Sequence, residues 1–391
     1  MIPLDIFIEG YPSFFKYVLG KNMSELSTTS NSPLPIKERI ILFARNNMGL
    51  ISTLISILAI GLALLIGGIL IAIAGINPWE AITYLIKGSF GNRYGFGETL
   101  TRFVPLLFCS LSFAIAHKSG FFNVGAEGQL LMGAVGAVLV GAYIDGLHPV
   151  LHVLLCIIAG IIFGAVWAGI AGFLKIFLSS DELINTMMLN YVAILLVDYL
   201  IHGPIKPPES YLYVSATILP SAKLPIILSK SPLHLGFIIS LLVTAAVFYL
   251  IYRTPIGYQM RAVGANRRAA SYAGINIVWA TIVALITTGG LAGMGGAMEL
   301  MGTQFKIVNG FSAGYGFDGI GVAVMGRYNP IGILLAALLF AVIRVGMGAM
   351  QRGAGVPFPL LNVIQGLIIV FVIASGYLTN KLSETVIGGR A

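Results

Sequence analysis

Charged side chains interrupt several long apolar stretches of this sequence, where a charge is costly and usually faces a partner or a water-filled cavity. Glu127 and Asp318 sit beside glycines, and we expect them to hold two interrupted helices by accepting hydrogen bonds from freed backbone amides. Direct contact with a substrate is the alternative for both. Asp198 and Glu299 lie near the ends of their stretches, where they can reach water. The candidates are Arg102, Glu127, Asp198, Glu299, Asp318 and Arg344.

Uncharged amides and aromatic rings form a second group of candidates. A neutral polar solute needs hydrogen-bond partners and a stacking surface more than a fixed charge, and this inventory permits both. Aromatic residues at the ends of spans are, however, more often interfacial anchors. Tyr315, Asn185 and Gln365 belong to the same inventory. We expect the substrate path to include Asn123, Glu127, Gln129, Asn190, Gln304, Phe305, Asp318 and Asn362.

Enzyme chemistry finds little support in the sequence. It contains no HExxH zinc motif and no GxSxG nucleophile elbow, and the histidines at ligand spacing, His148 and His152, lack a nearby third ligand. Cys109 and Cys156 fall within apolar runs, which favours packing over a disulfide or a thiolate site. The sequence also lacks a G-x-x-x-x-G-K-[ST] phosphate loop for ATP. We expect no catalytic residue, metal site or cofactor on this chain.

A basic, acid-free island at 253–276, RTPIGYQMRAVGANRRAASYAGIN, lies between two apolar segments. Its capping signals predict two short helices joined by a turn, because Thr and Asn cap free amides, Pro suits the first helical position and Gly ends a helix. In chain order these signals are Thr254 and Pro255, the stop Gly264, the cap Asn266 and the stop Gly274. A loop that only fixes topology is the simpler alternative.

The elements that position these residues are membrane spans. Of the 391 residues, 57% are hydrophobic and 10% are charged, with a mean hydropathy of +0.93. Ordinary soluble proteins carry roughly a quarter charged residues, so the chain is a polytopic, all-α membrane protein. The net charge of +8 would suggest nucleic acid in a soluble protein, but here the basic residues lie in loops between spans. We therefore expect no nucleic-acid partner.

A span needs about 20 apolar residues, which predicts about ten spans. The distribution of Lys and Arg favours cytoplasmic N- and C-termini. Residues 1–46 show no cleavable signal pattern. Residues 1–20 suit an amphipathic segment on the membrane surface, and a disordered tail is the alternative. The proline-rich outer loop 203–233 suits an ordered cap or docking lip. The expected spans are 48–75, 99–117, 125–144, 150–176, 184–202, 234–252, 277–301, 310–326, 331–350 and 360–377.

Two sequence patterns bear on how the spans pack. Small residues recur every four positions, which lets helix backbones approach closely. A weak internal symmetry relates FNVGAEGQLLMGA to YGFDGIGVAVMGR, and segments five spans apart cross the membrane in opposite directions. This relation suggests inverted repeats with interrupted helices near the substrate. The small-residue stripes are Gly160, Gly164, Ala168 and Gly172; Gly133, Ala137 and Gly141; and Gly289, Gly293 and Ala297.

Four ordered motifs resemble the integral-membrane permease of bacterial ABC importers, in the branch of ribose, branched-chain amino acid and nucleoside permeases. They are FFNVGAEGQLLMG at 121–133, DELINTMMLNYVA at 181–193, TPIGYQMRAVGANRRAASYAGI at 254–275 and GYGFDGIGVAVMGRYNPIG at 314–332. The form GFDGIGVAVMGR looks most like the nucleoside permeases that work beside a basic-membrane-protein type lipoprotein. The N-terminal extension is longer than in that family.

The resemblance implies a type II ABC importer permease architecture with inverted repeats, in the bacterial cytoplasmic (inner) membrane. It also implies that 253–276 couples to a separate ATPase, which would hold the ATP and magnesium. Further implied partners are a second, related permease chain and a substrate-binding lipoprotein, with the lipid bilayer around the spans. The expected organisation is an N-terminal segment 1–46, a permease domain 47–379 and a cytoplasmic tail 380–391. Coupling residues are expected at Thr254, Pro255, Gly257, Arg261, Gly264, Asn266, Arg267 and Arg268.

The function expected from these features is nucleoside uptake by alternating access, driven by ATP on the partner subunit. Transport of ribose, another sugar or a branched-chain amino acid by the same machinery is one alternative. Another is a secondary transporter or channel, in which Asp198, Glu127 or Asp318 would couple to an ion. Such a transporter would survive loss of the ATPase and collapse with an uncoupler.

Overall fold

The computed structural model describes residues 48–388 of the chain. The chain divides into a large unit, Ile55–Tyr377, and a small one formed by Met1–Leu54 and Leu378–Ala391. Of the small unit, the described residues are helical. The predicted segment 1–46 lies outside the described residues. The predicted tail from 380 is helical as far as Gly388, because the last helix continues well beyond the expected end of its span.

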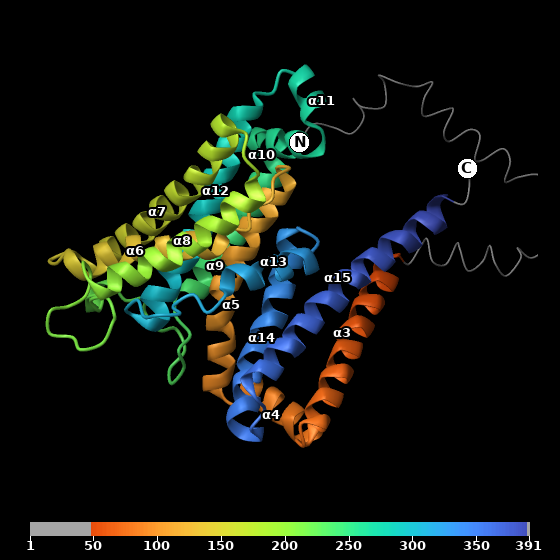
Figure 1. Ribbon diagram of the computed structural model, residues 1–391, viewed down its shortest axis with the longest axis horizontal. Coiled ribbons are helices and arrows are strands. Elements are labelled where there is room, and N and C mark those ends of the chain that lie inside the picture. The colour runs from red at the N-terminus through yellow and green to blue at the C-terminus, as the bar shows by residue number, and fades with distance from the viewer. Residues whose placement is uncertain (1–47, 389–391) are drawn as a thin grey trace, which may run out of the picture. The chain divides into compact units, whose positions relative to one another are not determined.

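Helices and the loops between them make up the described residues, with two isolated β-bridges and no strands there (Figure 1). The predicted all-α class is confirmed. The helices are α3 (Met48–Ile73), α4 (Pro78–Phe90), α5 (Arg93–Lys118), α6 (Ala126–Tyr143), α7 (Pro149–Leu178), α8 (Glu182–His202), η2 (Pro220–Ala222), α9 (Gly236–Arg253), α10 (Pro255–Ala265), α11 (Arg267–Tyr272), α12 (Ile277–Glu299), the π-helical η3 (Leu300–Gln304), α13 (Tyr315–Met325), α14 (Pro330–Ala354) and α15 (Phe358–Gly388).

Among the described helices, 8 are long and apolar enough to cross a membrane, so the predicted count of ten is not confirmed. The expected span 310–326 is instead the 11-residue helix α13, preceded by an irregular segment. Eleven residues at 1.5 Å each cover only about half of the hydrocarbon thickness. Hydropathy alone does not distinguish such a half-span from a complete one. In α3 the apolar stretch is the shorter Leu58–Ile73.

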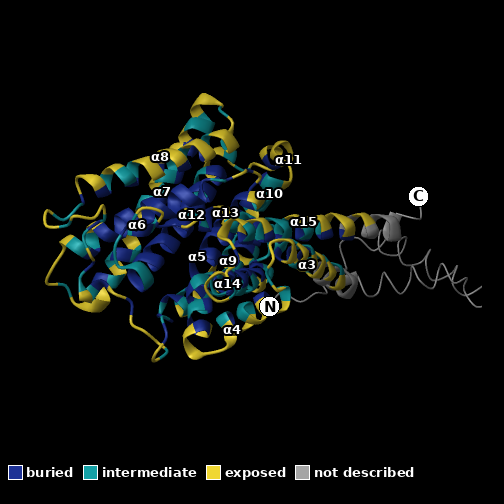
Figure 2. Cartoon of the chain, turned by 60° about the horizontal axis from the view of Figure 1, so that its bottom comes forward, coloured by how far each residue is buried: buried dark blue, intermediate teal, exposed yellow. Residues whose placement is uncertain are grey.

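The centre of the large unit is built from α5, α6 and α12, whose residues are mostly dark blue in Figure 2, and from α7, which buries one face against them. Apolar side chains are as well solvated by lipid as by one another, so close backbone packing must hold such helices together. An added Cβ at Gly133 would lie 2.2 Å from the carbonyl oxygen of Gly293, and one at Gly164 would lie 2.3 Å from that of Gly289. The predicted packing role of these small-residue stripes is confirmed.

A second apolar cluster joins α3, α4, α14 and α15 within the large unit. The helix α4 lies in a segment that the span assignment left between two spans. Asn77 caps it by accepting from the Trp79 amide, and Pro78 occupies its first position. An added Cβ at Gly88 would lie 2.2 Å from the Ala349 Cβ, which shows how closely α4 approaches α14.

The predicted ordered cap is confirmed, because the loop between α8 and α9 is tied by backbone hydrogen bonds to the break after α12. Leu224 N donates to Met301 O at 3.0 Å, and Ile218 N donates to Phe305 O at 2.9 Å. Thr101 Oγ1 on α5 also donates to Pro232 O at 3.1 Å. The loop therefore satisfies carbonyl groups that the irregular segment leaves without helical partners. Its proposed docking role stays a prediction.

Candidate functional site

The first turns of α6 and α13 meet through Glu127. The Gly316 amide donates to Glu127 Oε2 at 2.7 Å, and the Ser312 hydroxyl donates to Oε1. Glu127 is 3% exposed, and an added Cβ at Gly316 would lie 2.2 Å from the Glu127 nitrogen. The expectation that Glu127 accepts freed backbone amides is confirmed. The helix that it holds is α13, in the other half of the predicted repeat, rather than its own.

Asp318 has a different environment from Glu127. Its carboxylate accepts from Arg344 Nη1 at 2.6 Å and from Gln365 Nε2 at 2.7 Å. The expectation that Asp318 caps backbone amides is therefore wrong, because side chains from α14 and α15 donate to both of its carboxylate oxygens. Arg344 also donates to the Ala313 carbonyl, and its guanidinium lies 4.1 Å from the centre of the Tyr315 ring. This ion pair thus ties the start of α13 to the two helices that follow.

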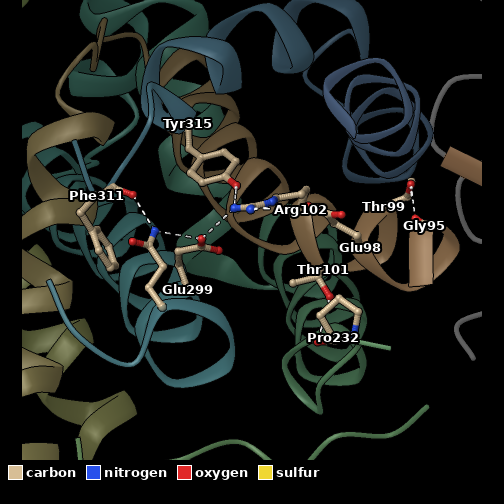
Figure 3. Close-up of polar contacts among 10 residues, drawn as sticks. Gly95, Glu98, Thr99, Thr101, Arg102, Pro232, Glu299, Phe311 and Tyr315 are labelled. Atoms are coloured by element: carbon tan, nitrogen blue, oxygen red, sulfur yellow. Dashed lines mark hydrogen bonds and ion pairs between the residues drawn. The ribbon is translucent and has the colours of Figure 1, made fainter. Parts of the chain in front are cut away.

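A third polar cluster surrounds Arg102 on α5 (Figure 3). Its Nη1 donates to Tyr315 Oη at 3.0 Å and to Glu299 Oε1 at 3.2 Å, and Glu98 lies 3.7 Å away. Gln304 donates to the same Glu299 oxygen at 3.1 Å and to the Phe311 carbonyl at 2.8 Å. The cluster joins α5, α12, η3 and the segment before α13.

Glu299 is 1% exposed, so the expectation that it reaches water is wrong. The chain continues past it as the buried π-helical turn η3, and the α8–α9 loop covers that turn through the Leu224–Met301 hydrogen bond. Such π-helical turns are rare and often lie at functional sites. The break after α12 is thus stabilised by two contacts. The buried Glu299 carboxylate accepts from Gln304, and the backbone of the α8–α9 loop donates to Met301.

The predicted path residues Asn123, Gln129 and Asn190 belong to a separate, fully buried network. Asn123 and Gln129 exchange amide hydrogen bonds of 3.0 and 3.1 Å. Asn190 accepts from the Gly128 amide and donates to the Val124 carbonyl, both at 2.9 Å. These groups fasten α8 to the turn that enters α6. Their place in a substrate path stays a prediction.

Two cavities lie beside the broken helices. The α14–α15 cavity, of about 520 Å³, contains the predicted residues Asp318 and Asn362. The α8 cavity, of about 360 Å³, contains Glu127 and Asp198 together with the 308–314 segment. Further residues of the α14–α15 cavity are Glu98, Arg102, Ala313, Tyr315, Arg344, Val345, Met347, Gly348, Gln351, Arg352, Phe358, Leu361, Gln365, Gly366 and Ile369.

The two remaining predicted path residues lie at the break after α12. Gln304 is held by Glu299 and the Phe311 carbonyl, so it positions the break. Phe305 adopts a left-handed backbone, with φ of 59°, and Lys223 Nζ lies 4.7 Å from the centre of its ring. Neither residue belongs to the lining of the two cavities. Their contact with substrate stays a prediction.

The basic island forms α10 and α11 at the end of the large unit opposite α4 (Figure 1). Thr254 Oγ1 accepts from the Gly257 amide at 3.1 Å, and Asn266 Oδ1 accepts from the Ala269 amide at 3.0 Å. The predicted start of each helix is confirmed. An added Cβ at Gly257 would lie 2.0 Å from the Leu250 carbonyl, so this glycine permits a tight turn out of α9.

Gly264 does not end its helix as predicted, because α10 continues to Ala265. It instead allows contact with the turn after α5, since an added Cβ would lie 2.1 Å from the Lys118 carbonyl oxygen. Arg261 is partly buried, with its guanidinium 5.5 Å from the centre of the Tyr252 ring. The short helix α11 exposes Arg267, Arg268 and Tyr272, the last of which is 93% exposed.

Sequence reasoning missed several residues of the α14–α15 cavity. The missed residues lie at helix ends, where polar and aromatic residues are common: Gln351, Arg352 and Phe358. The sequence signal that could have indicated the cavity is the spacing of residues on α15. Phe358, Asn362 and Gly366 recur every four residues, which places them on one face of α15.

Comparisons with known proteins give a consistent result. A sequence model of the family described as "Branched-chain amino acid transport system / permease component" matches residues 95–373. The guanosine ABC transporter permease protein NupP of Bacillus subtilis is 35% identical over 326 residues, covering 82% of this chain and 93% of the relative. The nucleoside ABC transporter permease protein NupB of Lactococcus lactis is 31% identical over 328 residues, covering 82% and 90%.

A sugar permease is also similar. The glucose ABC transporter permease protein TsgB13 of Haloferax volcanii is 31% identical over 331 residues, covering 82% of this chain and 87% of the relative. No solved structure matches the chain. The similar permeases thus include relatives named for nucleosides and relatives named for a sugar.

Proposed function

This chain belongs to the permease-component family of branched-chain amino acid transport systems, and on that premise we propose that it is the membrane subunit of an ATP-driven nucleoside importer. It is a multi-pass membrane protein and a transport component. The proposed location is the bacterial inner membrane, with both termini in the cytoplasm. In that orientation α10 and α11 are cytoplasmic, and the α14–α15 cavity lies toward the outer face.

One observation supports a neutral substrate most directly. The carboxylates of the α14–α15 cavity have arginine partners, since Asp318 pairs with Arg344 at 2.6 Å and Glu98 lies 3.7 Å from Arg102. A cation that entered would compete with ion pairs that are already formed and partly desolvated. A nucleoside carries no charge at neutral pH and can use amides and an aromatic ring, which the cavity also contains. The relatives named for guanosine and nucleosides agree with this reading.

We assign the energy input to a separate ATPase subunit, which would hold ATP and magnesium. The exposed helix α11 and the tip of α10 offer it a basic docking surface. A second permease chain and a substrate-binding lipoprotein complete the proposed complex, with the lipoprotein facing the α8–α9 loop. ATP binding would draw the two ATPases together and move α10 with them. Hydrolysis would then return the permeases to their starting state.

The deciding experiment is uptake of radiolabelled nucleosides by vesicles that contain the reconstituted complex and its binding protein. We expect uptake that requires internal ATP and persists in the presence of an uncoupler. Uptake that persists without ATPase and collapses with the uncoupler would favour a secondary transporter. Vesicles that accumulate glucose or ribose but no nucleoside would overturn the substrate assignment and favour the sugar alternative, which the glucose relative supports.

A further inference from the structure

The α14–α15 cavity contains one arginine that the ion pairs described above do not use. Arg102 contacts Glu98, Glu299 and Tyr315, and Arg344 contacts Asp318 and Ala313. Arg352 lines the same cavity and is exposed, and it forms no ion pair with any residue in the described part of the chain. Its guanidinium donors are therefore available to a ligand.

The position of Arg352 follows from a glycine one turn earlier. An ideal Cβ added at Gly348 would lie 3.4 Å from Arg352 Nη1, so the arginine side chain extends back along α14 and lies over this residue. Both residues line the cavity. The guanidinium thus lies against the helix surface beside the cavity rather than extending past the end of α14.

Further lining residues of the cavity come from the start of α15. Phe358 is 58% exposed and lines the cavity with Asn362, which lies one helical turn further on. Residues four apart on a helix share a face, so the ring and the amide are presented together. Gln351, next to Arg352 on α14, supplies a second amide. An aromatic ring, two amides and a planar five-donor cation therefore line one cavity.

This combination fits one class of nucleobase better than the others. The fork of an arginine matches two neighbouring acceptors in a plane, as on the O6/N7 edge of guanine, whereas adenine presents a donor at position 6. Aromatic side chains stack on unpaired bases, and side-chain amides pair with their remaining edges. Resting on the proposed nucleoside function, we propose that Arg352, Phe358 and Asn362 form a subsite for 6-oxopurine nucleosides, guanosine and inosine, in which Arg352 selects against adenosine.

The experiment compares guanosine and adenosine uptake by vesicles that contain the complete complex, with the same binding protein in every assay. Any change in the ratio then belongs to the permease. Arg352→Lys keeps the charge but loses the fork, and Arg352→Gln loses both. We expect both variants to raise the KM for guanosine about tenfold, a value within the range for one bidentate base contact, while the KM for adenosine changes less than twofold. Arg93→Gln, an exposed arginine on α5 outside the cavity lining, is the matched control.

The outcomes distinguish failure of the subsite proposal from failure of the proposed function. If wild-type vesicles take up no nucleoside, the proposed function itself is wrong. Wild-type guanosine uptake with an unchanged guanosine-to-adenosine ratio in both Arg352 variants would overturn the subsite alone. Equal losses for guanosine and adenosine would also overturn it, because they would mean a structural role. Inhibition of wild-type uptake by guanosine monophosphate that disappears in Arg352→Gln, with guanosine uptake unaltered, would show an anion site instead.

Discussion

Gly264 on α10 lies against Gly120 in the turn after α5, so closely that an ideal Cβ at Gly120 would stand 2.7 Å from the Gly264 Cα. That turn leads directly into the entry of α6, where Glu127 contacts the start of α13. A displacement of α10 would therefore act on backbone rather than on a flexible side chain. This contact gives α10 a short physical connection to Glu127 and the start of α13.

Gly264→Ala is predicted to disrupt this connection. The added methyl group would lie 2.1 Å from the Lys118 carbonyl oxygen, so α10 or the turn must shift. We expect ATP hydrolysis by the complex to continue while nucleoside uptake falls at least several-fold, measured on the same vesicles. Ala265→Ser, at an exposed neighbouring position, is the control. Tightly coupled hydrolysis and uptake in Gly264→Ala would show that the contact does not transmit motion.

The exposed basic helix α11 is predicted to bind the ATPase. Arg267→Glu combined with Arg268→Glu reverses two exposed charges without touching the core. We expect the variant to reach the membrane at normal levels and to co-purify with little ATPase, with the remaining association weakened further by salt. Co-purification is measured against an affinity tag on the ATPase. Normal recovery of the ATPase at all salt concentrations would exclude α11 from the interface.

Arg261→Glu makes a useful contrast with the α11 variant. Its guanidinium lies 5.5 Å from the Tyr252 ring and its Nε is buried, so a carboxylate there would lose a favourable contact and enter a partly desolvated site. We expect reduced thermal stability as well as reduced uptake, measured as Tm in detergent. A variant with wild-type Tm and lost ATPase binding would instead place Arg261 in the docking surface.

The Glu127 carboxylate is predicted to stabilise α13. Glu127→Ala would leave the Gly316 amide and the Ser312 hydroxyl without their acceptor in a buried setting, which costs about 1.5–3 kcal/mol. Glu127→Gln keeps one carbonyl acceptor and should cost less. The measurement is the Tm of purified permease for both variants against wild type. Equal Tm values for all three proteins would mean that the carboxylate does not hold the helix.

The Asp318–Arg344 pair is suited to a double-mutant cycle. Both side chains are 19% exposed, so removal of one partner should destabilise the protein by about 2–3 kcal/mol, somewhat less than for a fully buried pair. Asp318→Asn and Arg344→Gln together should recover part of that loss, because neither leaves an unpaired charge. Stability is measured by thermal unfolding of the four proteins. Strictly additive losses would show that the two groups do not interact.

The helix caps and the small-residue stripes were predicted correctly, because each depends on residue types that are close together in the sequence. The caps Thr254 and Asn266 act on amides three residues away, so residue type and position suffice. The small-residue stripes were also predictable, since only small residues allow the approach of Gly133 to Gly293. The need of Glu127 for backbone donors followed from the cost of a charge in an apolar stretch.

Partners distant in sequence could not be predicted in this way. Nothing local indicates that Glu127 serves α13 or that Asp318 pairs with Arg344, because α13 and α14 must first pack beside α5 and α6. The prediction that Glu299 reaches water was wrong for a related reason, because its burial depends on the α8–α9 loop, which is distant from it in the sequence. The half-span α13 was predicted as a full span, because the apolar stretch at 310–326 includes an irregular segment as well as the 11-residue helix.

The shortness of α13 also bears on how the protein is made. A helix of 11 residues is too short to be inserted into a bilayer by its own hydrophobicity. Its carboxylate partner on α6 is synthesised almost 190 residues earlier, as the separation of 189 positions between Glu127 and Gly316 records. We therefore expect the first half of the chain to provide the surface on which α13 completes its insertion, so that the order of synthesis matches the order in which the contacts are needed.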